Sequence, residues 1–448
     1  MWRKNWRTND LWAGKEYNMK IEKTERERII RLVKQQVVPA MGCTEPICVS
    51  LCVARAAEVL GERPVAVSVF LSANILKNAM GVGIPGTGMV GLPIAIALGV
   101  VAGKSAYGLE VLKDVTPTDV ELGKQYIAER RVKISLKEGI SEKLYVEAIV
   151  ESESGHRATA VIAGQHTHFV YVEKDGKVLL DNRMPQGEEA GEDECELNLR
   201  KVYDFSVEAP LEEIEFIREA RRLNESASRQ ALKGCYGHEL GKTLSRPLGR
   251  GIMGDTIFSH ILSSTSCACD ARMAGAMIPV MSNSGSGNQG ICATMPVVVF
   301  AEENHNTDEE LVRALMLSHL TAIYIKQSLG VLSALCGCVV ASTGSSCGIT
   351  YLMGGKYEQV SYAVKNMIAN LTGMICDGAK PSCALKLTSG VSTAVLSAML
   401  AMQQKCVSSV EGIIDDDVDK SIHNLTSIGA EAMNETDRKV LEIMTHKS

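Results

Sequence analysis

The sequence predicts an α/β plus all-α protein, in which a small α/β domain accompanies a larger, mainly helical domain. Residues 132–136, 144–150 and 158–163 alternate between apolar and polar positions and are rich in β-branched residues, as strands of a half-buried sheet are. From residue 208 almost to the end the apolar spacing is helical, with glycine-rich turns between the segments. A chain of 448 residues is long enough for two or three domains with their own cores.

In chain order, four parts are expected. Residues 1–18 are polar and are expected to form a disordered N-terminal extension. Residues 19–107 are expected to form an N-terminal helical part that packs on the larger domain. The α/β domain then spans 108–200 and includes an acidic linker near its end, and the mainly helical domain with the cysteine-bearing loops spans 201–448.

The first of these parts shows helices, a strand and an uncharged stretch. Residues 24–40 have the spacing of an amphipathic helix, a second helix is expected to end at Gly61, and residues 65–71 alternate as a strand does. No residue is charged between positions 77 and 104, but glycines and prolines break the first half of this stretch. The apolar run 92–102 is too short to span a bilayer, so a buried helix behind a glycine-rich loop is expected, and no membrane.

Composition excludes several classes of function. The net charge is −6 and no basic stripe with interleaved aromatic residues occurs, so nucleic acid is not an expected partner. The fourteen cysteines stand in a long chain whose start lacks the apolar stretch of a signal peptide. We therefore expect a cytoplasmic protein, in which prominent cysteines more often serve metal binding or catalysis than disulfides.

A loop dense in glycine, serine and asparagine indicates a ligand site. Such a loop allows backbone N–H groups to approach an anion closely, helped by the helix expected after it. The alternative is a plain helix–helix connection with an N-cap, and the density of small polar residues favours ligand binding over it. The candidate substrate-binding residues of this loop are Ser282, Asn283, Ser284, Gly285, Ser286, Gly287, Asn288 and Gln289.

Part of this loop, residues 286–290, also resembles the substrate-carboxylate loop of pyridoxal-phosphate (PLP) enzymes that act on serine and cysteine. Those enzymes need a Schiff-base lysine shortly upstream of the loop. No lysine occurs between positions 243 and 325, so PLP is disfavoured as a cofactor.

Two further loops carry cysteines. Cys336 lies in one, and Cys376 and Cys383 flank a turn with Asp, Gly and Pro in the other. The spacing is not that of a ferredoxin, but it is compatible with three thiolates that converge from two loops. Three ligands suit an iron–sulfur cluster with one open iron that acts as a Lewis acid. For any one of these cysteines alone, a buried structural role would be favoured.

Five motifs in chain order carry a family resemblance. They lie at residues 42–46, 85–93, 282–290, 332–336 and 374–379. Together they resemble the L-cysteine desulfidase family, UPF0597, which is related to the iron–sulfur L-serine dehydratases. The resemblance covers nearly the whole chain after Met19 and implies a serine-dehydratase-like fold, with the larger domain as the catalytic one.

The resemblance implies a cofactor and two roles for cysteines. It implies a [4Fe–4S] cluster on Cys336, Cys376 and Cys383, and it implies that Cys43 accepts a proton from the substrate, L-cysteine. A glycine-flanked turn at a helix N-terminus is one way to lower the pKa of such a thiol. Other cysteines lie outside the family positions and are expected to be structural: Cys267, Cys269, Cys292, Cys338 and Cys347.

Further polar residues are candidates for binding the carboxylate of the amino acid. Asn74, Lys77 and Asn78 are weaker candidates than the 282–290 loop. Arg272 can do the same, although a structural pair with Asp270 is equally consistent with the sequence. His166, at the end of an expected strand, is either a contact of the site or a satisfied loop histidine.

The hypothesis is a lyase that eliminates hydrogen sulfide from L-cysteine, leaving pyruvate and ammonia after hydrolysis of the product. The first alternative is an iron–sulfur dehydratase of serine or a related hydroxy amino acid. The second is a cluster-free regulatory or structural protein that retains the fold. The expected partner is a small-molecule amino acid, and the apolar helices make a homodimer the expected assembly.

Overall fold

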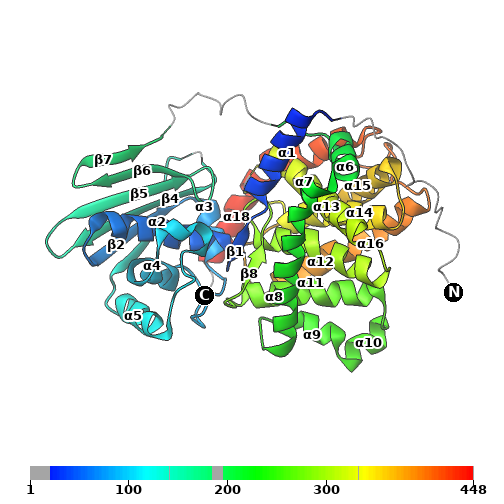
Figure 1. The fold of residues 1–448 in the computed structure, drawn as a ribbon. Helices are drawn as coiled ribbons and strands as arrows, with labels where there is room; N and C mark the ends of the chain where they lie inside the picture. Colours follow the sequence, from blue (N-terminus) through cyan, green and yellow to red (C-terminus); the bar gives the residue numbers. More distant parts are fainter. Residues whose placement is uncertain (1–20, 141, 184–194, 331, 447–448) are drawn as a thin grey trace.

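The computed structural model describes residues 21–140, 142–183, 195–330 and 332–446, which form a sheet unit and a helical unit side by side (Figure 1). One hydrophobic core draws mainly on residues 47–172, and the other mainly on residues 195–425. Five buried residues of the N-terminal region also pack into the helical core: Ile29, Val33, Val37, Cys43 and Val82. The expected extension at 1–18 lies outside the described residues.

The sheet unit is built on a six-stranded mixed sheet with the order β3-β2-β4-β5-β6-β7. β2 and β3 run parallel, and the other neighbours run antiparallel. Every second residue of β4 is buried, as expected for a sheet with one covered face. The strands are β2 (Pro64–Leu71), β3 (Val132–Leu136), β4 (Tyr145–Ser152), β5 (Arg157–Ala163), β6 (Phe169–Lys174) and β7 (Lys177–Asp181).

Helices cover one face of this sheet. α2 packs on β4 and β5, and α4 packs on α2, where a Cβ at Gly99 would lie 2.8 Å from the Ser50 carbonyl oxygen. β2 lies between β3 and β4, so the stretch before residue 108 contributes a strand to the sheet itself. The limits of the four expected parts of the chain stay predictions. The helices of this unit are α2 (Thr44–Leu60), α3 (Ala73–Ala79), α4 (Leu92–Val101), the 3-10 helix η1 (Ser105–Glu110) and α5 (Pro117–Ala128).

The helical unit confirms the helical spacing read from residue 208 onward. α13 and α14 are in close contact, α12 and α16 pack on α14, and α18 reaches across to α3 of the sheet unit. The longer helices are α1 (Lys23–Gln36), α6 (Leu199–Glu208), α8 (Arg218–Lys233), α11 (Ile257–Met273), α12 (Gly287–Glu303), α13 (Asp308–Leu329), α14 (Gly337–Leu352), α15 (Tyr357–Leu371), α16 (Cys383–Met402), α17 (Val418–Ser427) and α18 (Asn434–Thr445). The shorter ones are α7 (Leu211–Ile214), η2 (Glu215–Ile217), α9 (Leu240–Ser245), α10 (Pro247–Met253) and the π-helix η3 (Ile428–Ala432).

A two-stranded antiparallel ribbon connects the start of the chain to the helical unit. β1 (Pro39–Met41) pairs with β8 (Pro279–Met281). β1 leads directly into the turn that carries Cys43, and β8 leads directly into the loop at 282–290. The ribbon therefore holds two of the five sequence motifs against each other.

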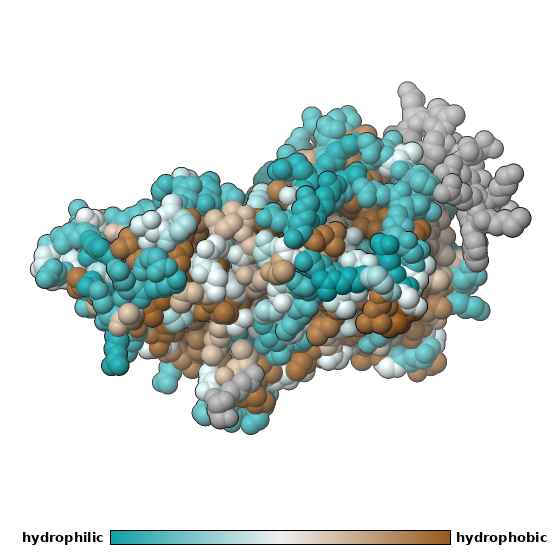
Figure 2. All heavy atoms as spheres, turned by 90° about the horizontal axis from the view of Figure 1, so that it is seen from below, coloured by the Kyte–Doolittle hydropathy of each residue, from teal (hydrophilic) through white to brown (hydrophobic). Residues whose placement is uncertain are grey.

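Apolar residues also reach the surface. In the view from below they gather in brown over the helical unit (Figure 2), and α10, at its lower edge in Figure 1, exposes Leu248 and Ile252. Within the described residues, one helix, α16, has the length and apolar composition of a membrane span. Half of its most apolar window is buried inside the protein, and buried core helices share this composition.

Because α13 packs closely on α14, adding one methyl group at their contact is expected to destabilise the protein. Gly344 lies against the Ser318 backbone oxygen, well inside the distance that a Cβ tolerates. Gly344→Ala is expected to lower the free energy of unfolding by about 1–3 kcal/mol in urea titrations. Gly251→Ala, at a helical glycine with open space around it, is the matched control and is expected to be neutral or slightly stabilising. Equal stability of the two variants would contradict this packing.

Candidate functional site

Cys43 lies at the seam between the two units, immediately before α2. Its side chain is 1% exposed. The thiol donates to Glu45 Oε2 over 3.0 Å, and the other carboxylate oxygen of Glu45 accepts from Asn78 Nδ2 at 3.1 Å. Cys43, Glu45 and Asn78 thus form one hydrogen-bonded group at the N-terminus of α2.

The electrostatics of Cys43 differ from the sequence expectation. Burial raises the pKa of the Cys43 thiol well above its usual value, and the charge of Glu45 raises it further. Arg272 lowers the pKa, but not enough to compensate. The position at a helix N-terminus therefore does not suffice to produce a thiolate, and Cys43 rests as a neutral thiol.

Arg272 approaches the same place from α11. Its Nη2 lies 3.4 Å from Thr44 Oγ1, at the first residue of α2. The sequence left open a pair with Asp270, but Asp270 Oδ2 accepts instead from the Gly241 backbone N–H at 3.0 Å. Arg272 is thus a buried cation beside Cys43.

His166, from the connection between β5 and β6, lies against the 282–290 loop. A Cβ on Gly285 would come within 2.7 Å of His166 Nδ1. The imidazole is buried, and burial lowers its pKa, so it is a neutral side chain that faces the loop. The structure therefore places His166 within the site.

The loop is held from behind by a buried polar network. Asn283 Nδ2 donates to His319 Nδ1 at 3.1 Å, and His319 Nε2 lies 3.0 Å from Thr294 Oγ1, which itself donates to the Gly290 carbonyl. Burial lowers the pKa of His319 to about 3. A permanently neutral imidazole with Nδ1 as acceptor and Nε2 as donor satisfies every one of these bonds.

This network assigns framework contacts to part of the predicted loop. Ser282 Oγ donates to the Val38 carbonyl at 2.6 Å, and Ser284 Oγ donates to Asn283 Oδ1 at 2.9 Å. Ser284 has a φ of 47°, and Ser286 caps α12 through the backbone N–H of Gln289. The roles of the loop residues as substrate ligands stay predictions, because several of their side chains already serve the loop itself.

Asn74 and Lys77 are both bonded to one carboxylate of the C-terminal helix. Lys77 Nζ pairs with Asp437 Oδ1, and Asn74 Nδ2 donates to Asp437 Oδ2 at 3.0 Å. Lys77 Nζ also lies 3.4 Å from the Cys376 carbonyl oxygen. These two residues join the sheet unit, α18 and the loop of Cys376, and their proposed contact with substrate stays a prediction.

The two cysteine loops are clamped together by backbone hydrogen bonds. The Cys336 N–H donates to the Met374 carbonyl at 2.9 Å, and the Cys376 N–H donates to the Ala334 carbonyl at 2.6 Å. Cys336 is the residue before α14, and Cys383 is the first residue of α16. The clamp and the two helix starts bring the three cysteines to one place.

The thiols influence one another electrostatically. Burial raises the pKa of Cys376 to about 11, and the charge of Cys336 contributes to this. A hydrogen bond from Cys338, whose sulfur lies 3.3 Å away, lowers the pKa of Cys336 to about 7 against the effect of burial. Burial also raises the pKa of Cys383, and the charge of Cys336 acts in the same direction. Cys338, expected to be structural only, therefore tunes Cys336.

Lysines surround these thiols, and one of them was missed by the sequence analysis. Lys326 is buried near the end of α13, and burial lowers its pKa to about 8, against the charges of Cys376 and Glu45, which raise it. Lys386 donates to the Ile375 carbonyl at 2.7 Å and pairs with Asp377. A lysine among the mainly apolar side chains of residues 322–325 and 329 near the end of α13 was the signal available for Lys326.

The donor set fits an anionic iron–sulfur cluster. Soft thiols suit iron–sulfur chemistry, and nearby ammonium groups offset the negative charge of thiolates and cluster. Among the described residues, no three His, Cys, Asp or Glu side chains are arranged to hold a single metal ion. A cluster of four irons spreads its cysteine ligands more widely than one ion does, so this arrangement does not conflict with a cluster.

Polar atoms without partners concentrate at this seam. In the described ranges, six buried side-chain N or O atoms lack a hydrogen-bond partner, and such atoms are rare in folded proteins. Four of the six belong to residues of this site: Asn78 Oδ1, His166 Nε2, Arg272 Nε and Gln289 Oε1. A polar ligand at the seam would satisfy them.

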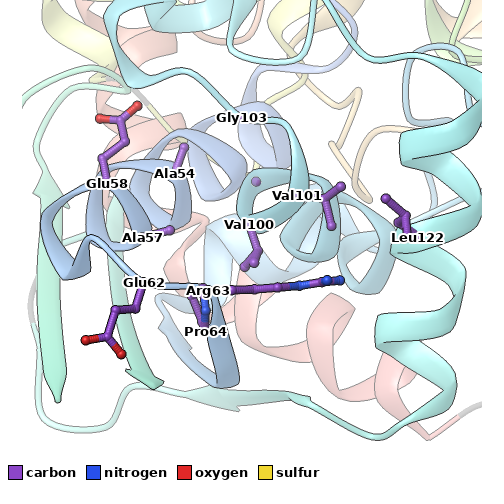
Figure 3. A pocket seen from close by; sticks show the side chains of 11 residues that line it. Ala54, Ala57, Glu58, Glu62, Arg63, Pro64, Val100, Val101, Gly103 and Leu122 are labelled. Atoms are coloured by element: carbon purple, nitrogen blue, oxygen red, sulfur yellow. The ribbon is translucent and has the colours of Figure 1, made fainter. Parts of the chain in front are cut away.

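A cavity of about 410 Å³ lies elsewhere, between the C-terminal half of α2, α4 and α5. Arg63 extends beneath Val100 and Val101 toward Leu122, whereas Glu58 and Glu62 lie on the other side (Figure 3). Its lining contains neither cysteine nor histidine. We therefore place the chemistry at the seam and not in this cavity.

Comparisons with known proteins show the family to which the chain belongs. The family model of the serine dehydratase alpha chain matches residues 106–442, which include all three cysteine loop positions but not Cys43. A UPF0597 protein of Bacteroides thetaiotaomicron is 70% identical over 424 residues, covering 95% of this chain and 99% of the relative. UPF0597 proteins of Porphyromonas gingivalis and Shewanella halifaxensis are 53% and 46% identical over 433 residues each, covering 95% and 93% of this chain and 100% and 98% of the relatives. The chain therefore belongs to the serine dehydratase alpha chain family, a family of lyases, and to the UPF0597 proteins. This confirms the resemblance drawn from the sequence at the level of the family.

The His319 network predicts a pH-dependent stability difference. His319→Leu leaves one N–H of the Asn283 amide without its acceptor and removes one hydrogen bond to Thr294 Oγ1, which costs about 1–3 kcal/mol at pH 7.5 in urea unfolding. The folded-state pKa of about 3 lies below the ordinary 6.5, so the unfolded wild type binds a proton first as the pH falls. The wild type therefore loses stability as the pH falls below about 6.5. The difference in unfolding free energy between the wild type and His319→Leu shrinks by on the order of 2 kcal/mol by pH 5.

The control for this prediction is His423→Leu, at an exposed position of α17. Its stability difference from wild type is expected to stay constant over the same pH range. A constant difference for His319→Leu as well would contradict a neutral buried imidazole.

Proposed function

We propose that this protein eliminates hydrogen sulfide from L-cysteine, with a [4Fe–4S] cluster held by Cys336, Cys376 and Cys383. The single observation that carries the proposal is the pair of clamped loops that bears the three cysteines, linked to the surroundings of Cys43 by Lys326, which interacts with the charges of both Cys376 and Glu45. Four buried polar atoms without partners among the described residues support a ligand there. Membership of a lyase family supports the reaction class. The choice of cysteine as substrate is our inference from the resemblance at the five motifs.

The cluster, when bound, would supply a Lewis-acidic iron that polarises the departing sulfur or oxygen of the substrate. The chain's own residues do the rest. Arg272 Nε, beside Gly287, would bind the substrate carboxylate together with N–H groups of the loop. Cys43 would receive the Cα proton, and the burial of Cys43, His166 and Arg272 excludes water from the reacting atoms.

Dehydration of L-serine is the second candidate, favoured by the name of the matched family model. The same site would then act on a hydroxyl group in place of a thiol. Anaerobically reconstituted protein with both substrates separates the two, and we expect kcat/KM for pyruvate formation to be higher with L-cysteine. A higher value with L-serine would make the protein a dehydratase, and the absence of iron after reconstitution would favour a cluster-free protein. Cytoplasmic localisation and a homodimer stay predictions.

The division of labour among the cysteines is testable by substitution. Cys376→Ala is expected to lose iron and the visible absorbance of the cluster, because one of three thiolate ligands is gone. Cys43→Ala is expected to keep iron and absorbance but to lose turnover. Cys347→Ala, in the middle of α14, is the control and should keep both. Loss of iron in Cys43→Ala would make Cys43 a ligand and contradict its proposed role.

Arg272 provides a test of substrate binding. Arg272→Gln removes a charge-assisted contact with the carboxylate, so KM for L-cysteine is expected to rise about 10- to 100-fold. Arg222→Gln, at an exposed position of α8, is the control. An unchanged KM in folded Arg272→Gln would show that Arg272 serves the framework alone.

A further inference from the structure

We propose that Glu45 is the group to which Cys43 passes its proton, so that the two residues act as one relay between the substrate and solvent. This inference rests on the proposed function and deepens it. Glu45 acts through Cys43 and is therefore a positioning and proton-accepting residue. Glu45 lies in the sequence motif at 42–46, and the roles proposed for Cys43, Arg272 and the 282–290 loop do not involve Glu45.

The geometry fixes both ends of the Glu45 carboxylate. Oε2 accepts from the Cys43 thiol at 3.0 Å, and Oε1 accepts from Asn78 Nδ2 at 3.1 Å. Cys43 is the N-cap residue of α2 and Glu45 lies in its first turn, so the helix backbone sets their separation. Glu45 therefore has little freedom to turn away from the thiol.

The resting state of Cys43 creates the need for such a partner. A neutral thiol cannot accept the Cα proton of a substrate until it has lost its own proton. The side chain is 1% exposed, so bulk water does not serve as the acceptor. Among the described residues, Glu45 accepts the hydrogen bond of this thiol, and it is the acceptor already in place.

Glu45 also has a route to return the proton. It is half-buried, whereas Cys43 is sealed inside the seam. The groups that face this pair from the surrounding elements are Asn78 of α3, His166 of the β5–β6 connection, Arg272 of α11 and Lys326 of α13. Two of these groups, Arg272 and Lys326, bring positive charge to the surroundings of the pair.

The step balances in protons and electrons. The thiol proton moves from Sγ to Glu45 Oε2, and the Cα proton of the substrate moves to Sγ. The electron pair of the broken Cα–H bond forms the Cα=Cβ double bond, and the pair of the broken Cβ–S bond leaves with sulfur as hydrosulfide. Glu45 ends as a carboxylic acid and releases its proton to water.

Substitution of Glu45 in the cluster-loaded protein is expected to slow turnover and to make the Cys43 thiol more acidic, and the two effects are measured separately. Glu45→Gln is expected to lower kcat at least ~100-fold, with KM within about threefold of wild type, because the acceptor is lost. The Cys43 thiol should become more acidic, because a like charge is removed, so its alkylation by iodoacetamide should begin at lower pH. Peptide mass spectrometry reports the alkylation of Cys43 separately from the other cysteines.

Two matched variants accompany Glu45→Gln. Glu45→Asp keeps an acceptor and should recover part of the turnover. Glu58→Gln, near the other end of α2, should behave as wild type in both measurements. A general loss of structure would also expose Cys43 and lower its pKa, so both measurements are made on Glu45→Gln protein whose cluster absorbance and urea unfolding match those of the wild type.

Several results would overturn the relay. Wild-type turnover in Glu45→Gln would show that the acceptor is not needed, and an unmoved alkylation profile would show that the carboxylate does not act on the thiol. Turnover retained by Cys43→Ala but lost in Glu45→Gln would make Glu45 itself the base. Alkylation is independent of turnover, so a wild-type protein that releases no sulfide would overturn the proposed function, while a shifted alkylation profile in Glu45→Gln would still show that Glu45 acts on the Cys43 thiol.

Discussion

Burial of ionisable side chains between two packed units is the constraint on which this structure depends. Cys43 precedes α2, Arg272 lies in α11 and Lys326 in α13, yet all three are removed from water at the seam. A buried charge is tolerated only when other charges or hydrogen bonds compensate it. The sheet unit supplies Glu45 and the helical unit supplies Arg272 and Lys326, so neither unit alone satisfies the groups that it buries.

The same constraint explains how the site is assembled. The backbone clamp between the Cys336 and Cys376 loops, the β1–β8 ribbon and the Lys77–Asp437 pair each join segments that are distant in the chain. The His319 network fixes the glycine-rich loop from the side of the helical core. Four of the six buried polar atoms that lack partners in the described ranges lie at the seam, and this is the physical basis for assigning a ligand to it.

Sequence patterns predicted the parts whose chemistry is local. Alternating apolar and polar residues predicted β2 to β5, and helical spacing predicted α2 and α4. Cysteines beside turn-forming residues predicted the two loops that backbone hydrogen bonds clamp together. The β6–β7 hairpin turns at Asp175 and Gly176, with φ of 49° and 80°, and this Asp-Gly signal was overlooked. Glu45, His319 and Lys326 depend on contacts across the fold, and a lone ionisable residue in a helical pattern does not reveal its partners. The resting state of Cys43 was likewise hidden, because burial is set by packing across the seam.

In the proposed site, Cys336, Cys376 and Cys383 would hold a [4Fe–4S] cluster and leave one iron without a protein ligand. Mössbauer spectroscopy of protein reconstituted anaerobically with iron-57 tests it most directly, before and after addition of L-cysteine. We expect one iron in four to be distinct in the resting protein and its signal alone to shift when L-cysteine binds. Four irons that stay unchanged on addition of the substrate would contradict it.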